Sequence, residues 1–353
     1  MKEFIELTEE FAKRIVEIEN QRKKIGSFLK EINSTSEEKI ILPIEEKELE
    51  NLRIAGVDGG LVKKSFHGID LMLLRAIAVI FNYAKNKLSS VEYFPSTIPS
   101  PEPKIIIDPF SELEFEINSN LERQIIEINT ARKTLEKFDL DFLFLNGSII
   151  PHYTFVPERS SLLFETYEKM IESYRKLFEI VSKKKVILAG IIEDSRGTRF
   201  CEIINQKTQE KLTSNLKFLL AKTKDTNLLS YVLDFKERTF SFPYSSKPKI
   251  HPILKEFNNF AEQVFTFYLK TAEFDRPIRV DFLSDKDDKS GIISSVLLAL
   301  AGHSSYGMPS VLIEADQRAK LSEKDLEIFC SDLINKTGNL SALFSLRREQ
   351  RPF

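Results

Sequence analysis

An acidic residue followed by two glycines is the stretch whose residue types best fit chemistry at a phosphate or a metal ion. The apolar residues 53–57 predict a short strand, with Asp58 at its carboxyl end and Gly59-Gly60 after it. The glycines let the backbone turn sharply and leave the adjacent space open to a ligand. A carboxylate held at such a place can bind a metal ion. An ordinary Asp-Gly-Gly turn fits the same residues.

A second strand end repeats this layout further along the chain. Residues 142–145 are apolar and precede Asn146-Gly147-Ser148, so a polar side chain and a glycine again follow a strand. The carboxyl ends of neighbouring parallel strands face one crevice, which is where open α/β sheets bind ligands. Apolar residues at helical spacing predict a helix over 112–137, on which Glu122 and Glu127 are candidate inward carboxylates.

Two classes of chemistry fit an acidic strand of this kind. A ribonuclease H-like sheet uses such an Asp to hold divalent ions against a phosphodiester, whereas an actin-like or sugar-kinase fold uses an Asp-x-Gly turn to cradle nucleotide phosphates. The second class needs a further phosphate loop and a glycine-rich adenosine motif late in the chain. Gly302-His303 and Gly307 are poor substitutes for these, and the sequence has no P-loop of the Gly-x-x-x-x-Gly-Lys type. The metal-dependent class is therefore favoured.

The composition is that of an ordinary folded protein of 353 residues, with 42% hydrophobic and 29% charged residues. A net charge of −2 excludes a global basic field, so any DNA contact must come from local groups of lysine and arginine. The candidates are Lys63-Lys64, Lys183-Lys184-Lys185 and the tail residues Arg347, Arg348 and Arg351. Each of these groups is equally well explained as ordinary charged residues on a solvated surface.

The two cysteines, Cys201 and Cys330, form no Cys-x-x-Cys pair and have no clustered histidines beside them, so structural zinc is not expected. We predict that both are buried thiols in a reducing cytoplasm. The first residues are too charged for a signal peptide, and no unbroken apolar run is long enough to span a bilayer. The expected location is cytoplasmic, without membrane contact.

The order of predicted elements indicates an α/β protein with a mixed sheet flanked by helices. Residues 1–50 are expected to form an N-terminal helical arm and connector, which docks on its own domain or serves a partner subunit. Residues 51–340 form the main domain, and 341–353 form a basic tail. The expected strands are 53–57, 61–66, 70–83, 91–94, 142–145, 186–192, 260–270 and 277–282, and the expected helices are 2–33, 112–137, 162–183, 290–302 and 322–336. The first strands should form an antiparallel meander, and 198–248 should be less regular.

Four short motifs, taken in order, resemble the NurA nucleases. They are Gly56-Val57-Asp58-Gly59-Gly60, Leu145-Asn146-Gly147-Ser148, the segment 188–195 and the segment 307–316. Each motif is short, and the specificity lies in their order and spacing over residues 50–340. The family comprises archaeal and bacterial DNA end-processing enzymes with a ribonuclease H-like core, which work beside the hexameric ATPase HerA.

The resemblance implies manganese- or magnesium-dependent hydrolysis of DNA in double-strand break repair, with 5′ to 3′ exonuclease and single-strand endonuclease activity, by a ring-shaped homodimer. The family's first metal-binding aspartate falls on Asp58 and its helix-borne glutamate on Glu127. The next three positions are altered, because the second aspartate falls on Asn146, the tyrosine before proline on Met308, and the histidine eight residues later on Asp316. Loss of an outer-shell partner alone costs about 10–100-fold in metal affinity or activity, so loss of a ligand charge should cost at least as much.

Two hypotheses of different classes follow from this pattern. The first is a working metal-dependent nuclease with a rearranged ligand set of Asp58, Glu127 and Asp316, in which Asn146 is a neutral ligand. The second is a catalytically impaired paralogue that keeps the fold, the dimer and contacts to DNA or the ATPase as a structural or regulatory subunit. Family resemblance favours the first hypothesis, and the altered positions favour the second.

Overall fold

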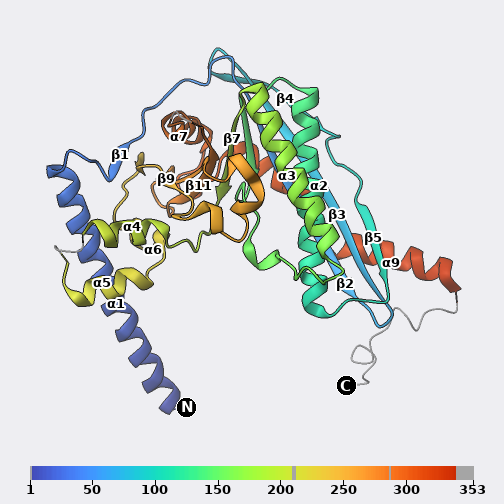
Figure 1. Cartoon of the computed structure of the whole chain (residues 1–353), viewed down its shortest axis with the longest axis horizontal. Coiled ribbons are helices and arrows are strands. Elements are labelled where there is room, and N and C mark those ends of the chain that lie inside the picture. The colour runs from blue at the N-terminus through green and yellow to red at the C-terminus, as the bar shows by residue number, and fades with distance from the viewer. Residues whose placement is uncertain (1, 209–211, 286–287, 339–353) are drawn as a thin grey trace. The chain divides into compact units, whose positions relative to one another are not determined.

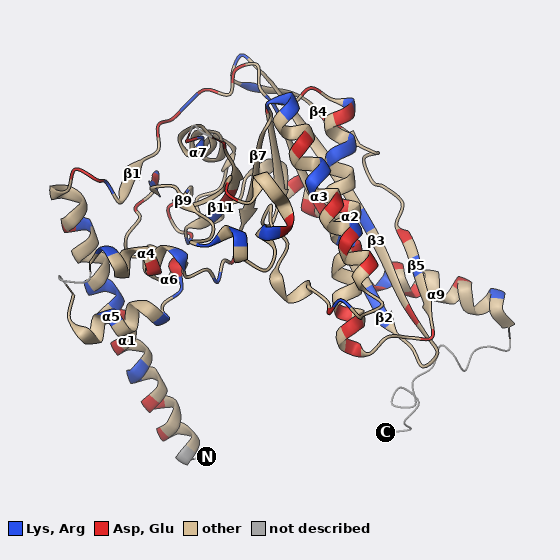
Figure 2. Cartoon of the chain, in the orientation of Figure 1, with Lys and Arg blue, Asp and Glu red and all other residues tan. Residues whose placement is uncertain are grey.

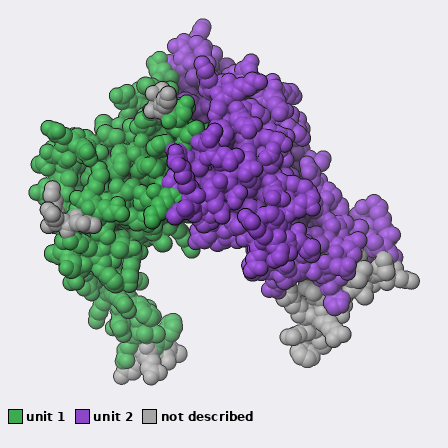
Figure 3. Space-filling model, in the orientation of Figure 1, with its two compact units in different colours: residues 1–48, 191–247, 263–309 green, residues 49–190, 248–262, 310–353 purple. Residues whose placement is uncertain are grey.

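The computed structural model of the chain describes residues 2–208, 212–285 and 288–338, and the basic tail expected at 341–353 lies outside them. The chain forms two compact units, which Figure 3 draws in different colours. Unit 1 comprises Met1–Glu48, Ile191–Lys247 and Gln263–Pro309, and unit 2 comprises Leu49–Gly190, Pro248–Glu262 and Ser310–Phe353. Each unit is thus assembled from segments that are distant in the sequence.

Unit 2 is built on a mixed sheet (Figure 1). Its strands are β2 (Arg53–Ser65), β3 (Ile69–Ala84), β4 (Lys87–Phe94), β5 (Glu102–Ile107), β6 (Phe142–Asn146) and β7 (Ile187–Ile192), of which the last two residues of β7 belong to unit 1. The strand order is β7-β6-β2-β3-β4, and β5 also pairs with β3. The antiparallel pairing of β2, β3 and β4 confirms the predicted meander. β6 runs parallel to β2, which is the arrangement expected for the two polar strand segments.

Helices cover both faces of this sheet. α2 (Glu112–Lys137) packs on one face beside α3 (Phe164–Lys184), and α8 (Ser310–Ala319) packs on the other. Neighbouring glycines of β2 mark the two faces, because successive side chains of a strand point to opposite sides. A Cβ added at Gly59 would lie 3.2 Å from the Cβ of Glu127 on α2, whereas one added at Gly60 would lie 2.0 Å from the carbonyl oxygen of Ala319 on α8.

The remaining elements of unit 2 extend this core. β3 is buried along most of its length, as its continuous apolar run predicts. α9 (Glu323–Thr337) begins after a capping box between Ser322 and Asp325, which confirms the predicted helix start. The short helices are η1 (Tyr153–Phe155), η2 (Pro248–Ile250) and η3 (Leu254–Phe260).

Unit 1 contains a long N-terminal helix, a second set of strands and several short helices. They are α1 (Lys2–Thr35), β1 (Ile41–Pro43), α4 (Arg199–Lys207), α5 (Ser214–Lys222), α6 (Asp225–Leu229), β8 (Glu237–Thr239), β9 (Phe242–Pro243), β10 (Val264–Lys270), β11 (Ile278–Leu283) and α7 (Ser290–Leu300). The predicted N-terminal helix is confirmed. Its C-terminal half packs into the unit through the buried Ile25 and Leu29, whereas Phe4, Phe11 and Ile15 on its N-terminal half are exposed.

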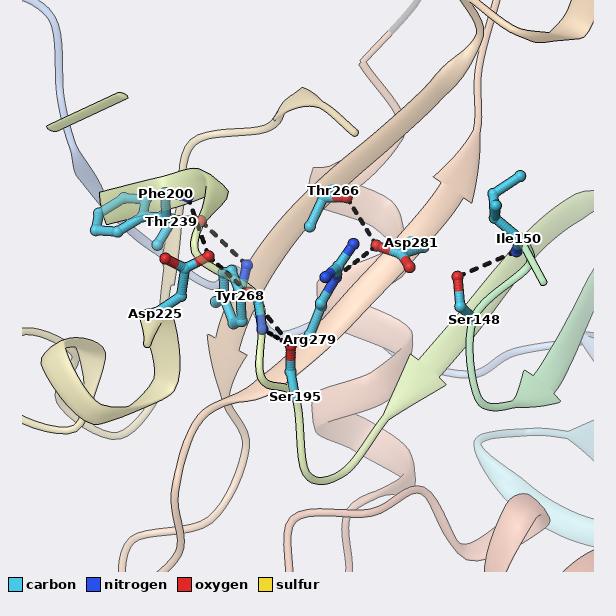
Figure 4. Close-up of polar contacts among 11 residues, drawn as sticks. Ser148, Ile150, Ser195, Phe200, Asp225, Thr239, Thr266, Tyr268, Arg279 and Asp281 are labelled. Carbon is cyan, nitrogen blue, oxygen red and sulfur yellow. Dashed lines mark hydrogen bonds and ion pairs between the residues drawn. The ribbon is translucent and has the colours of Figure 1, made fainter. Parts of the chain in front are cut away.

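Buried polar side chains in unit 1 satisfy one another (Figure 4). The Asp225 carboxylate accepts hydrogen bonds from two backbone amides at the start of α4, and the Tyr268 hydroxyl donates to it at 2.8 Å. Asp281 accepts from Arg279 Nε at 2.8 Å and from the Thr266 hydroxyl at 2.7 Å. Because these charged groups are paired inside the protein, the network stabilises unit 1 and offers no free reactive group.

Two expectations from the sequence are wrong. Residues 53–65 form one strand, so Asp58 lies inside β2 and not at its end, because β3 pairs with both following glycines (Gly59 with Ala76 and Gly60 with Arg75). The region 198–248, expected to be irregular, contains α4, α5 and α6. These helices have only nine, nine and five residues, which is too short for a clear helical repeat. The helix at Ser310–Ala319 was also not foreseen in the sequence.

Candidate functional site

β2 and β6 place Asp58 and Asn146 side by side in unit 2. The parallel register ends with Val57 beside Leu145, so the next residue on each strand is one of these two polar residues. Asn146 Nδ2 donates a hydrogen bond to Asp58 Oδ2 at 3.0 Å, and the Gly59 N–H donates to Asp58 Oδ1 at 2.7 Å. Burial raises the pKa of the Asp58 carboxyl to about 6, and these two hydrogen bonds oppose the rise.

α2 brings Glu127 against the same strand. The absence of a side chain at Gly59 permits this approach, since a Cβ there would lie 3.0 Å from Glu127 Oε2. Arg123, one turn earlier on α2, donates from Nη1 to Glu127 Oε2 at 2.9 Å and to the Gly59 carbonyl oxygen at 3.4 Å. Burial raises the pKa of the Glu127 carboxyl to about 8, the Arg123 charge lowers it, and the Asp58 charge raises it further.

The other two candidate positions do not complete a ligand set. Asp316 lies on α8 with an exposed side chain, and its negative charge contributes to the raised pKa of Asp58. Met308 belongs to unit 1 and is 3% exposed, so its side chain is withdrawn from solvent. Three of the predicted site residues, Asp58, Glu127 and Asn146, therefore lie around one short segment of β2.

These residues do not fit a catalytic divalent metal centre. Among the residues that the structure describes, no group of three His, Cys, Asp or Glu side chains is arranged to hold a metal ion. Each oxygen of Asp58 already accepts an N–H, and Glu127 is already paired with a cation. Asn146 turns its amide nitrogen toward Asp58, whereas a metal ligand would offer its oxygen. The site thus consists of two hydrogen-bonded pairs, Asp58 with Asn146 and Glu127 with Arg123, which both contact Gly59 or its neighbour on β2.

Arg123 is the site residue that the sequence reasoning did not identify. The signal was available, because residues four apart on a helix lie on one face and form ion pairs, as Arg123 and Glu127 do. The other candidate carboxylate of the helix, Glu122, forms an ion pair with Lys104 on β5. Glu127 is therefore the glutamate of this site.

The remaining candidate residues of the sequence have ordinary surroundings. Lys63 bonds Glu116 and Ser119, and Lys184 pairs with Asp139 at 3.4 Å. Figure 2 shows basic and acidic residues interspersed along α2 and α3, so these helices carry no field of a single sign. Both cysteines are free and buried, as predicted. No helix in the described residues has the length and apolar character needed to cross a membrane.

Comparison with known proteins identifies the family. A sequence model described as the NurA domain matches residues 52–321, which is most of the chain. The chain belongs to the NurA family. A comparison with curated proteins gives no match.

Solved NurA structures share the fold. The NurA nuclease from Sulfolobus solfataricus has a TM-score of 0.59 at 16% sequence identity, over 94% of this chain and 98% of that chain. A NurA structure bound to dAMP and manganese has a TM-score of 0.57 at 14% identity, over 98% of this chain and 100% of that chain. These similarities confirm the predicted α/β class, a ribonuclease H-like mixed sheet flanked by helices.

Proposed function

We propose that this NurA-family chain is a DNA end-processing subunit that binds DNA without hydrolysing it through a manganese ion. Membership of a family of nucleases supports DNA as the ligand. One observation carries the loss of hydrolysis: the Asn146 amide donates to Asp58 at the place where the family pattern has a second aspartate. The Asn146 side chain is neutral, and its amide N–H donates a hydrogen bond to Asp58, so this position supplies no anionic ligand.

The charge of the cluster supports the same conclusion. Asp58 and Glu127 carry two negative charges when ionised, and the Arg123 guanidinium offsets one of them. Magnesium and manganese bind hard anionic oxygens, commonly one or two carboxylates together with waters and substrate phosphates. Asp316, with its exposed side chain, does not replace the missing carboxylate in the described geometry. The site therefore offers a divalent cation less charge than the family pattern implies.

A second candidate function is a metal-dependent nuclease with Asp58, Glu127 and Asp316 as ligands to manganese or magnesium and with Asn146 as a neutral one. The observation that favours it is that α8, which carries Asp316, packs on β2 at Gly56 and Gly60, on either side of Asp58 in the strand. Manganese is present in solved NurA structures.

The proposed partners are a second copy of the chain and a HerA-type hexameric ATPase, in the cytoplasm. Support for an interaction arm comes from α1, whose N-terminal half exposes several large apolar side chains without a covering element in the described chain. They are Phe4, Ile5, Leu7, Phe11, Ile15 and Val16, which are 48–73% exposed. Apolar side chains exposed together on one helix mark interaction surfaces. The continuation of the same helix anchors this arm in unit 1.

The decisive experiment is degradation of labelled single- and double-stranded DNA by the purified protein in manganese, beside Asp58→Ala and Asn146→Asp. We expect no degradation by the native protein, and DNA binding that weakens as salt rises because phosphate contacts release counterions. Degradation by the native protein that disappears in Asp58→Ala would establish the second candidate. Failure of the native protein to bind DNA at low salt would overturn the proposed function.

A further inference from the structure

We propose that Arg123 is an internal counter-cation that occupies the electrostatic role of a divalent ion and keeps such ions out of the Asp58–Glu127 site. This inference rests on the proposed function, because it supplies the reason why the site does not use manganese. It assigns a role to a residue that lies outside the family's ligand pattern.

The position of Arg123 relative to the strand is the first observation. Its Cγ would lie 3.5 Å from a Cβ added at Gly59, so the aliphatic stem lies across the glycine. The guanidinium then reaches two acceptors with the same nitrogen, the Glu127 carboxylate and the Gly59 carbonyl oxygen. The cation is therefore held by both the helix and the strand that carry the two acidic residues.

The burial of its partner separates this ion pair from an ordinary one on a helix surface. The Glu127 side chain is 6% exposed, and that of Arg123 is 27% exposed. A buried carboxylate without a counter-charge is strongly destabilising, so some cation must accompany Glu127 when it is ionised.

The Asn146 amide is the polar neighbour of Asp58 on β6. With the amide nitrogen toward Asp58 Oδ2, the pair makes a favourable hydrogen bond without any metal. A divalent ion entering this place would find the Asn146 amide nitrogen turned toward Asp58 and the Arg123 guanidinium bound to Glu127 Oε2. The guanidinium would repel the ion. Both neighbours of the carboxylates thus favour the metal-free state.

The test is a measurement of manganese binding without DNA, by the loss of the electron paramagnetic resonance signal of free Mn²⁺. Arg123→Gln removes the charge and keeps most of the side-chain volume. We expect it to bind Mn²⁺ about tenfold or more tightly than the native protein, in line with the size of neighbour effects at metal sites. The double variant Arg123→Gln/Glu127→Gln should lose this binding again, because it no longer has the negative charge of Glu127.

A matched control lies on the same helix. Arg132 pairs with Glu136 at 4.0 Å with the same spacing, but Glu136 is 58% exposed. Arg132→Gln should leave Mn²⁺ binding at the native level. Arg123→Lys retains a cation and should also remain at that level. Arg123→Met removes the charge, keeps the aliphatic stem and should bind Mn²⁺ as Arg123→Gln does, which keeps the test decisive if Arg123→Gln fails to fold.

The outcomes separate this inference from the proposed function. Equal Mn²⁺ binding by the native protein and Arg123→Gln overturns the inference, as does tight binding by Arg123→Lys. A native protein that binds Mn²⁺ tightly but does not cut DNA overturns the inference alone. A native protein that also cuts DNA overturns both. Weak binding by the native protein, with a gain in Arg123→Gln that needs Glu127, supports the inference.

Discussion

Replacing Asn146 with Asp removes the amide that now joins β6 to Asp58. The native hydrogen bond from Asn146 Nδ2 to Asp58 Oδ2 is 3.0 Å long, and Asp58 is 6% exposed. A hydrogen bond to a charged group contributes about 1.5–3 kcal/mol. The new carboxylate repels the Asp58 carboxylate, and the two groups reduce this repulsion by sharing one proton. We therefore expect Asn146→Asp to lower the free energy of unfolding by about 2–4 kcal/mol at pH 7 without divalent ions.

The pH dependence of this deficit has a definite sign. The second carboxylate is expected to raise the pKa of the Asp58 pair above the value of about 6 that burial produces in the native protein. A carboxyl whose folded pKa lies above its unfolded pKa stabilises the fold while it is protonated, and this contribution is lost as the pH rises through the folded value. The deficit of Asn146→Asp should therefore be smaller at pH 5 than at pH 8.

The assay is urea unfolding followed by circular dichroism, at both pH values, with and without Mn²⁺. Asn20→Asp is the matched control, because it makes the same change at an exposed position of α1 and should have little effect. Mn²⁺ should restore part of the stability of Asn146→Asp and leave the native protein unchanged. An Asn146→Asp protein that is as stable as the native protein at pH 8 without metal would refute the reasoning about the Asn146–Asp58 hydrogen bond.

Three further predictions concern other parts of the chain. Gly60→Ala should destabilise unit 2 by about 3 kcal/mol or more, because its Cβ would lie 2.0 Å from the Ala319 carbonyl oxygen; thermal unfolding measures this. Burial lowers the pKa of His251, so its contribution to stability should be lost as the pH falls through the unfolded value of 6.5, and His251→Asn should flatten that part of the pH–stability curve. Phe11 and Ile15 are 52% and 60% exposed, so replacing both with glutamate should abolish self-association without unfolding the protein. Light scattering measures this.

Controls make these outcomes decisive. Gly291→Ala meets only one side-chain atom at 3.9 Å, so it should be tolerated where Gly60→Ala is not. An equal effect of both glycine variants would contradict the contact with α8. An unchanged dimer after charges are placed on the exposed part of α1 would remove that helix from the proposed interface.

Local sequence pattern alone determined much of the fold. The apolar runs of β3 and β6, the helical spacing of α2 and the capping residues of α9 each encode their element within a few neighbouring residues. The shared order of apolar residues, polar side chain and glycine in 54–60 and 142–147 also marked both polar segments. These features depend on contacts that are short in sequence, so the sequence predicts them.

Only the tertiary structure decided what surrounds the acidic residues. Asp58 meets Asn146 across 88 residues of sequence separation, and α8, which was not foreseen, covers the face of β2 at Gly60. The extended conformation of Gly59 and Gly60 is set by β3, where a turn was expected. The sequence shows which residues carry charge. Whether a buried carboxylate pairs with a metal ion or with an arginine depends on distances that long-range packing sets.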